Sequence, residues 1–141
     1  MAIHGLNVSM AVFIGLSART NPEAAAQLAE LLEPHGYRPW TIPVAAGLHL
    51  KSSVSWLGGQ TLLLCERFAD RPEFRAWRRI VVPAAGEPAC NTLLVNGTLL
   101  MPAGFPEVRR QLEQMAMPVV ELDVSEVRKM DGGLTCLSLR L

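Results

Sequence analysis

The hydrophobic and polar positions of this chain repeat one order of elements along its length. A short apolar run is followed by a turn, a second apolar run, an amphipathic stretch and a third apolar run. Short apolar runs bounded by glycine or proline are typical of strands, and longer amphipathic stretches are typical of helices. The pattern therefore predicts units of strand, turn, strand, helix and strand, each roughly 32 to 40 residues long.

The first unit begins with the apolar run AVFIG at 11–15, which predicts a strand that ends at a glycine. A helix should follow within 18–37, because Asn21 can cap its N-terminus and Pro22 suits its first position. A proline and a glycine near its end stop the helix. Residues 37–44 then resume an extended path.

The second unit contains two predicted strands, 49–57 and 60–68, which are joined by a turn of two glycines. Asp70 can cap a helix over 71–79, because a proline stands in its first turn. The apolar run at 80–83 predicts the next strand. This unit thus has the same order of elements as the general pattern.

The third unit gives the strongest hairpin signal in the chain. An Asn-Gly pair joins the apolar runs 91–95 and 98–102, and both turn residues accept positive φ. A helix is predicted over 105–115 and a strand over 118–122. The hairpin followed by a helix and a strand is therefore a complete example of the repeat.

The end of the chain predicts a short helix over 123–129 and a last strand over 132–141. No Pro/Gly/Ser-rich linker or charge run interrupts the sequence. We therefore expect one α/β domain over residues 1–141, with internal pseudo-symmetry, rather than a helical bundle or an all-β sandwich.

Composition narrows the classes of function. Half of the residues are hydrophobic and the mean hydropathy is +0.23, so an apolar surface that binds another subunit is expected. Thirteen basic and thirteen acidic residues cancel, which argues against nucleic acid or a membrane surface as partner. The three cysteines show neither zinc-ligand spacing nor a disulfide framework, so a reducing, cytoplasmic setting is expected.

Cys136 is the main candidate for chemistry, because two glycines stand just before it and let a ligand approach the backbone closely. A cysteine nucleophile needs a lowered pKa or a nearby base, which is commonly a histidine. Of the three histidines, His4 is expected in a frayed terminal segment and His35 at a helix end, whereas His49 lies at a boundary between loop and strand. The alternative is a buried structural cysteine and a histidine without a catalytic role.

Four segments resemble the second half of the dimethylarginine dimethylaminohydrolases, a family of the guanidino-group-modifying superfamily that includes arginine deiminases and amidinotransferases. The segments are FIGLSARTNPEAAAQLAELL, VAAGLHLKSSVS, Asn91 with the following LLVNGTLLMPAGFPE, and SEVRKMDGGLTCLSLRL. They occur in the family's order from about Val12 to Leu141. The resemblance implies the pentein fold, a five-bladed αβ propeller of ββαβ modules, of which this chain forms about half.

The resemblance also implies roles for particular residues. Cys136 matches the catalytic cysteine and His49 the catalytic histidine, whereas Arg19 matches an arginine that holds the substrate's α-carboxylate. Met130 falls where a backbone carbonyl accepts a hydrogen bond from the substrate. Cys65 and Cys90 match no role in the family and are expected to be structural.

The implied activity is hydrolysis of a guanidino amino acid to a ureido product such as citrulline. The Cys136 thiolate attacks the guanidinium carbon, an amine leaves, and His49 protonates the amine and then activates water. The resemblance implies neither a metal nor an organic cofactor.

The family's first half supplies acidic residues that bind the guanidinium, and no position of this chain matches them. Either a second copy or a separate subunit could complete the propeller, or an acidic residue near Cys136 in sequence, Asp123 or Asp131, could take over. Three hypotheses therefore stay open at this point. The chain is a hydrolase, alone or only as an oligomer. Alternatively it is a half-propeller that binds an amino acid or guanidine without turnover, or a fragment without a ligand.

Overall fold

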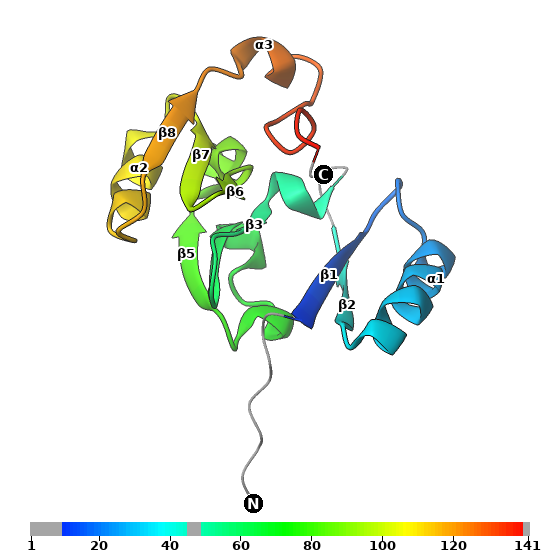
Figure 1. Cartoon of the computed structure of the whole chain (residues 1–141). Coiled ribbons are helices and arrows are strands. Elements are labelled where there is room, and N and C mark those ends of the chain that lie inside the picture. The colour runs from blue at the N-terminus through cyan, green and yellow to red at the C-terminus, as the bar shows by residue number, and fades with distance from the viewer. Residues whose placement is uncertain (1–9, 45–48, 140–141) are drawn as a thin grey trace, which may run out of the picture. The chain divides into compact units, whose positions relative to one another are not determined.

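The computed structural model describes residues 10–44 and 49–139 (Figure 1). The chain falls into two compact units, Met1–Leu50 and Lys51–Leu141. The expectation of one domain over 1–141 stays a prediction.

The first unit is a parallel pair of strands with a helix in the connection. Strand β1 (Ala11–Leu16) pairs in parallel with β2 (Arg38–Pro43), and α1 (Pro22–Leu32) lies between them in sequence. The side chain of Asn21 accepts a hydrogen bond from the Ala24 N–H at 2.8 Å. This bond satisfies one of the N–H groups that the first turn of a helix leaves unpaired. The predicted cap is thus confirmed.

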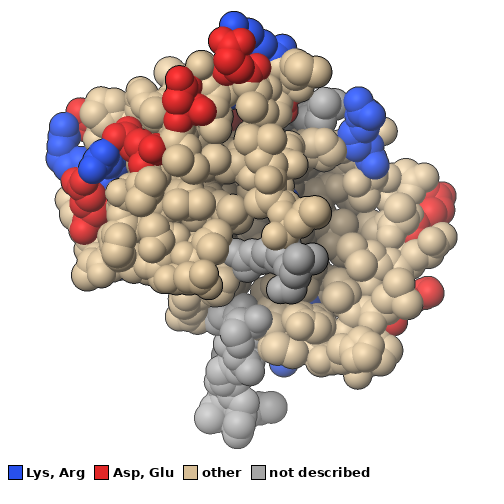
Figure 2. All heavy atoms as spheres, turned by 45° about the horizontal axis from the view of Figure 1, so that its top comes forward, with Lys and Arg blue, Asp and Glu red and all other residues tan. Residues whose placement is uncertain are grey.

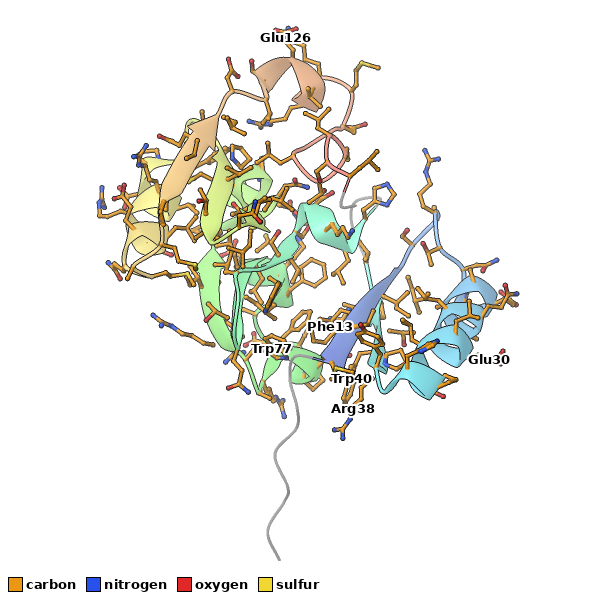
Figure 3. The ribbon with its side chains drawn as sticks, viewed as in Figure 1. Phe13, Glu30, Arg38, Trp40, Trp77 and Glu126 are labelled. Carbon is orange, nitrogen blue, oxygen red and sulfur yellow. The ribbon has the colours of Figure 1, made fainter. Side chains whose placement is uncertain are left out.

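The core of the first unit contains one buried residue from each strand and one from the helix. Ile14 and Ile42 are buried, as is Ala25 of α1. Phe13 and Trp40 are opposite each other in the register of β1 and β2 (Figure 3). Trp40 remains 42% exposed, so this pair covers less of the core than the isoleucines do.

The second unit contains two sheets of three strands each. The first consists of β3 (Val54–Trp56), β4 (Thr61–Cys65) and β5 (Arg78–Val82), and the second of β6 (Leu93–Val95), β7 (Thr98–Pro102) and β8 (Val119–Leu122). In each sheet the middle strand is antiparallel to the strand before it and parallel to the strand after it. This shared order confirms the predicted repeat of strand, turn, strand, connection and strand.

The helices of the second unit are short. They are α2 (Pro106–Glu113), between β7 and β8, and α3 (Ser125–Arg128). The described residues also include the 3₁₀ helices η2 (Glu33–His35), η3 (Leu50–Ser52), η4 (Glu66–Phe68), η5 (Pro72–Phe74) and η6 (Ala84–Cys90). The helix predicted over 105–115 is therefore confirmed in its central part, and η6 is an element that the sequence pattern did not predict.

The helix predicted over 71–79 is wrong. Only η5 is helical there, and residues from Arg78 onward form β5. The reason is tertiary pairing, because β5 is hydrogen-bonded along β4 and buries Ile80 and Val82 at alternate positions. This pairing overrides the local helical pattern, in which charged residues follow a proline. The strand predicted over 49–57 is also too long, because η3 occupies its first part.

The Asn-Gly turn between β6 and β7 confirms the predicted hairpin. Asn96 has φ of 48° and Gly97 has φ of 77°, both in the left-handed region. A two-residue turn with positive φ at both positions matches the twist of an antiparallel pair, and these two residue types reach that region most readily. Local turn chemistry thus sets the register of this hairpin.

Charged side chains of the second unit form local pairs of opposite sign on its helices (Figure 2). On α2, Arg109 contacts Glu113 at 2.8 Å and Arg110 contacts Glu107 at 2.6 Å. Exposed pairs of this kind contribute about 1 kcal/mol or less each to stability. In the described part of the chain, no helix is long and apolar enough to cross a membrane.

We expect burial of β4 to dominate the stability of the second unit, because all five of its residues are buried. Leu63→Ala should lower the free energy of unfolding by about 2–5 kcal/mol, because it removes buried methyl groups and leaves a cavity. Leu139→Ala is the matched control, because Leu139 is 92% exposed. Equilibrium unfolding in denaturant measures both, and equal midpoints for the two variants would contradict this assignment of the core.

Candidate functional site

The four site residues expected from the sequence are divided between the two units. Arg19 and His49 belong to the first unit, and Met130 and Cys136 belong to the second. All four are exposed, Met130 by 86%. Each lies in a turn or next to the end of an element, which is where a rigid scaffold usually presents functional side chains.

Cys136 lies in a turn, and the strand predicted over 132–141 is wrong within the described residues. The Cys136 N–H donates to the Gly133 carbonyl at 3.0 Å, and the Leu137 N–H donates to the same carbonyl at 3.3 Å. The turn buries Leu134 and leaves Cys136 and Leu137 exposed. The alternation of polar and apolar residues resembles a strand, but Leu134 is the residue that anchors the segment in the core.

Asn91 holds this turn in place. Its Oδ1 accepts the Thr135 N–H at 3.0 Å, and its Nδ2 donates to Thr135 Oγ1 at 3.0 Å and to the Lys51 carbonyl at 3.2 Å. Asn91 therefore connects the residue before Cys136 with the backbone two residues after His49. Sequence reasoning gave Asn91 no role, and its only signal was its place in a segment that resembles the family.

The backbone around Asn91 is fixed by η6, which ends at Cys90. The hydroxyl of Ser55 donates to the Cys90 carbonyl, and the hydroxyl of Ser53 donates to the Glu87 carboxylate in the same helix. The other oxygen of Glu87 pairs with Arg67. Residues in or next to β3, together with Arg67 of η4, thus hold η6 in place. Asn91 follows η6 directly.

Gly133 is required where the turn meets Asn91. A Cβ at Gly133 would lie 2.8 Å from Cγ and 2.9 Å from Oδ1 of Asn91. These distances are shorter than real Cβ contacts, so only glycine permits this approach. The glycine before Cys136 therefore serves packing against Asn91.

Arg19 lies in a tight turn after β1. Backbone hydrogen bonds join Ser17 and Thr20 in both directions, at 3.1 and 3.2 Å, and the Arg19 N–H donates to Ser17 Oγ at 3.1 Å. The turn stands at the carboxyl end of β1, and in α/β folds ligands bind at this end of the strands. The exposed guanidinium of Arg19 is suited to bidentate binding of a carboxylate.

His49 directly precedes η3, whose first residue Leu50 is buried. A Cβ at Gly15 would lie only 2.8 Å from the Cβ of Leu50, so glycine allows Leu50 to pack directly against β1. Gly15 is close to the carboxyl end of β1, and Arg19 follows that end. The first unit thus brings the residue next to His49 and the turn that carries Arg19 to the same end of one strand.

Met130 follows α3 at the point where the chain turns toward Cys136. Its N–H donates to the Val127 carbonyl at 3.1 Å, and the Gly132 N–H donates to the same carbonyl at 3.0 Å. Between them Asp131 has φ of 58°, an uncommon conformation for a residue with a side chain. A Cβ at Gly132 would lie 2.5 Å from Val127 Cγ1, so the turn also needs a glycine there.

Of the two aspartates considered above as replacements for the missing acidic residues, Asp123 already has a structural partner. Its carboxylate accepts the Ser125 N–H at 2.9 Å, at the start of α3. This hydrogen bond from the backbone holds the pKa of Asp123 below its usual range. Asp131 is exposed in the turn after Met130.

The other two cysteines are buried, in contrast to Cys136. Burial raises the pKa of the Cys90 thiol well above its ordinary value, because the thiolate loses its hydration there. Cys65 is the last residue of the buried strand β4. Within residues 10–44 and 49–139, no group of three or more His, Cys, Asp or Glu residues could hold a metal ion.

Comparisons with curated proteins identify dimethylarginine dimethylaminohydrolases as relatives, although no family model matches the chain. The chain is 40% identical over 128 residues to the enzyme of Pseudomonas aeruginosa, covering 91% of this chain and 50% of that protein. It is 33% identical over 137 residues to the enzyme of Streptomyces coelicolor, covering 96% and 52% respectively. The chain therefore spans about half the length of these relatives.

Solved structures show the same relationship. The P. aeruginosa enzyme, solved as a cysteine-to-serine variant in complex with citrulline, superposes with a TM-score of 0.88 at 38% identity, over 93% of this chain and 51% of that one. A dimethylarginine dimethylaminohydrolase solved as a histidine-to-glycine variant with an S-methyl-L-thiocitrulline adduct also gives 0.88 at 38%, over 93% and 52%.

A more distant structure extends the likeness in fold. An amidinotransferase from Microseira wollei superposes with a TM-score of 0.78 at 16% identity, over 92% of this chain and 44% of that one. Together these matches confirm the predicted α/β pentein class and its ββαβ modules. Over about half of their length, the chain is homologous to the dimethylarginine dimethylaminohydrolases, and it has the same fold as part of the M. wollei amidinotransferase.

Proposed function

We propose that this chain carries the nucleophile, the acid/base and a carboxylate-binding residue of a guanidino-group hydrolase of the dimethylargininase type. The observation that carries the proposal is Cys136, an exposed thiol on a turn anchored by Asn91, in a chain 40% identical to such a hydrolase. Citrulline, which is bound in the solved relative, is a ureido amino acid of the class that this reaction releases.

In the proposed reaction, the Cys136 thiolate forms a bond to the guanidinium carbon of an arginine derivative. The carbon–nitrogen bond to the leaving group breaks, and His49 gives its proton to the departing amine. The product of this step is a covalent thiouronium. His49 then takes a proton from water, whose oxygen attacks the same carbon, and the carbon–sulfur bond breaks to release the thiolate. The protonated ureido product then loses its extra proton to solvent.

Arg19 and Met130 would hold the amino-acid end of the substrate. The Arg19 guanidinium presents two parallel N–H donors that match the two oxygens of an α-carboxylate. The Met130 carbonyl would accept a hydrogen bond from the substrate. Met130 lies in the turn between α3 and the Cys136 segment, so two groups of the proposed site lie on one short stretch of chain.

The guanidinium of the substrate needs anionic partners, because a desolvated cation without them costs several kcal/mol. We propose that a second copy of this chain or a separate subunit supplies them. The comparisons support this, because the chain spans only about half the length of the relatives it matches.

The activity can be tested with arginine, methylated arginines and agmatine as substrates and formation of the ureido product as the readout. We expect Cys136→Ser to abolish turnover, because serine is a much weaker nucleophile without a lowered pKa. Unchanged turnover in Cys136→Ser would overturn the assignment of the nucleophile. Absence of turnover in the unmutated chain, with every substrate and after addition of a candidate partner subunit, would overturn the proposed hydrolase.

Carboxylate binding by the Arg19 guanidinium can be distinguished from an effect of its positive charge alone, because Arg19→Lys keeps the charge. Arg19→Lys should raise KM for arginine derivatives by about 10-fold, because lysine cannot form the bidentate pair with the carboxylate. KM for agmatine, which has no carboxylate, should stay within a factor of two. Arg110→Lys is the matched control, because Arg110 is exposed and pairs with Glu107 on α2. Equal effects on both substrates would contradict carboxylate binding.

The accessibility of the thiols provides an independent prediction. In the native protein one thiol per chain should react rapidly with a disulfide reagent at pH 8, because Cys136 is exposed and the other two cysteines are buried. Cys136→Ser should remove this fast phase, and unfolding in guanidinium chloride should expose three thiols in the unmutated chain. A fast phase that persists in Cys136→Ser would show that the exposed thiol is a different one.

A further inference from the structure

Asn91 makes three hydrogen bonds to two segments that are far from it in sequence. Two of them go to Thr135, 44 residues away, and one goes to the carbonyl of Lys51, 40 residues away. A side-chain amide has two acceptor sites and two donor hydrogens, so most of its bonding capacity is used here. All three partners lie in the second unit, and both segments flank proposed catalytic residues.

The position of Asn91 is itself fixed. Asn91 is only 7% exposed, and both neighbouring residues are buried. The residue before it is held in place, because the carbonyl of Cys90 accepts the Ser55 hydroxyl. A buried and fully oriented amide holds its partners with little freedom of its own.

The chemistry of the amide is specific to this place. Oδ1 accepts from the Thr135 N–H, and Nδ2 must donate to the Lys51 carbonyl, so one group has to be both acceptor and donor. An aspartate would keep the first bond and lose the second, because a carboxylate oxygen would then face the carbonyl oxygen of Lys51. Gly133 completes the arrangement, since only a residue without Cβ leaves room for the amide.

We propose that Asn91 is a positioning residue that fixes the turn carrying Cys136 to the backbone just after His49. This inference rests on the proposed function, in which the two residues act on the same carbon. The side-chain hydrogen bonds of Asn91 go to Thr135 and Lys51, and not to Cys136 or His49. It acts through the Thr135 backbone and the Lys51 carbonyl, and it keeps the thiol in the one orientation from which it attacks.

The test compares Asn91→Asp with Thr92→Val in the full chain, using two readouts. Thr92→Val is the matched control, because it removes one buried hydrogen bond at the next residue without touching the turn. The first readout is the rate of alkylation of Cys136 by iodoacetamide from pH 5 to 10, followed by peptide mass spectrometry. The second is kcat and KM for formation of the ureido product.

In Asn91→Asp we expect the midpoint of the alkylation profile to move to higher pH by at least half a unit. The loosened turn no longer holds the thiol in the fixed surroundings that a nucleophile needs to stabilise its thiolate. We also expect kcat to fall about 10- to 100-fold with KM changed less than threefold, because misplacement by about 1 Å costs rate rather than binding. Thr92→Val should leave the midpoint and kcat unchanged.

Gly133→Ala provides a second variant if Asn91→Asp does not fold, as judged by circular dichroism. Its added methyl group displaces the same amide, so the alkylation midpoint should move in the same direction. An unchanged alkylation profile in a folded Asn91→Asp or Gly133→Ala variant would overturn the inference. An equal shift in Thr92→Val would also overturn it, because the effect would then be general destabilisation.

The two proposals can fail separately. If the unmutated chain forms no ureido product, the proposed function fails, whereas the alkylation profiles need no turnover and still decide the role of Asn91. If turnover depends on Cys136 but not on Asn91, the hydrolase stands and the positioning role is overturned.

Discussion

The constraint on which the second unit depends is the complete burial of its middle strand, β4. A strand with all five residues buried needs a hydrogen-bonded neighbour on each edge and apolar cover on both faces. β3 and β5 satisfy the edges, and η6 contributes the buried Ala89 and Cys90 to the apolar core. Because η6 is held in this way, the residue that follows it, Asn91, has a fixed position. The packing of the core thus fixes Asn91, and Asn91 fixes the turn that carries Cys136.

The same logic explains why polar groups inside this unit are hydrogen-bonded to one another. Ser53 and Ser55 flank or lie in β3, and their hydroxyls donate to Glu87 and to the Cys90 carbonyl of η6. Burying a hydroxyl without a partner costs free energy, so each of these serines has one conformation that the core accepts. The serines therefore orient η6 as well as bury it. This gives a path of direct contacts from β3 through η6 and Asn91 to the Cys136 turn.

The elements that the sequence predicted well are those set by local chemistry. These are the Asn21 cap, the left-handed Asn96-Gly97 turn and the strands of the third sequence repeat, all of which depend on residues close in sequence. The helix over 71–79 was wrong because pairing of β5 with the buried β4 is a nonlocal effect. The last strand was wrong for a similar reason, since Asn91 binds the backbone of Thr135 from 44 residues away. The pattern of hydrophobic and polar residues along the chain does not reveal a hydrogen bond between residues so far apart in sequence.

The candidate site shows the same division between local and nonlocal information. A cysteine behind two glycines was visible in the sequence, but its combination with His49, Arg19 and Met130 came from the resemblance to a family. The structure adds a physical role for both glycines, because Gly132 packs against Val127 and Gly133 against Asn91. The two glycines therefore allow close packing of the segment before Cys136, whose thiol is exposed.

The three cysteines show how one fold gives the same side chain opposite properties. The Cys90 thiol is buried and its raised pKa keeps it protonated through the physiological range, so it serves packing. Cys136 is exposed because Leu134, two residues earlier, takes the buried position of the turn. Thiolate chemistry requires access to solvent or substrate as well as a stabilising cation. The turn geometry provides the access, because the burial of Leu134 leaves Cys136 at the surface.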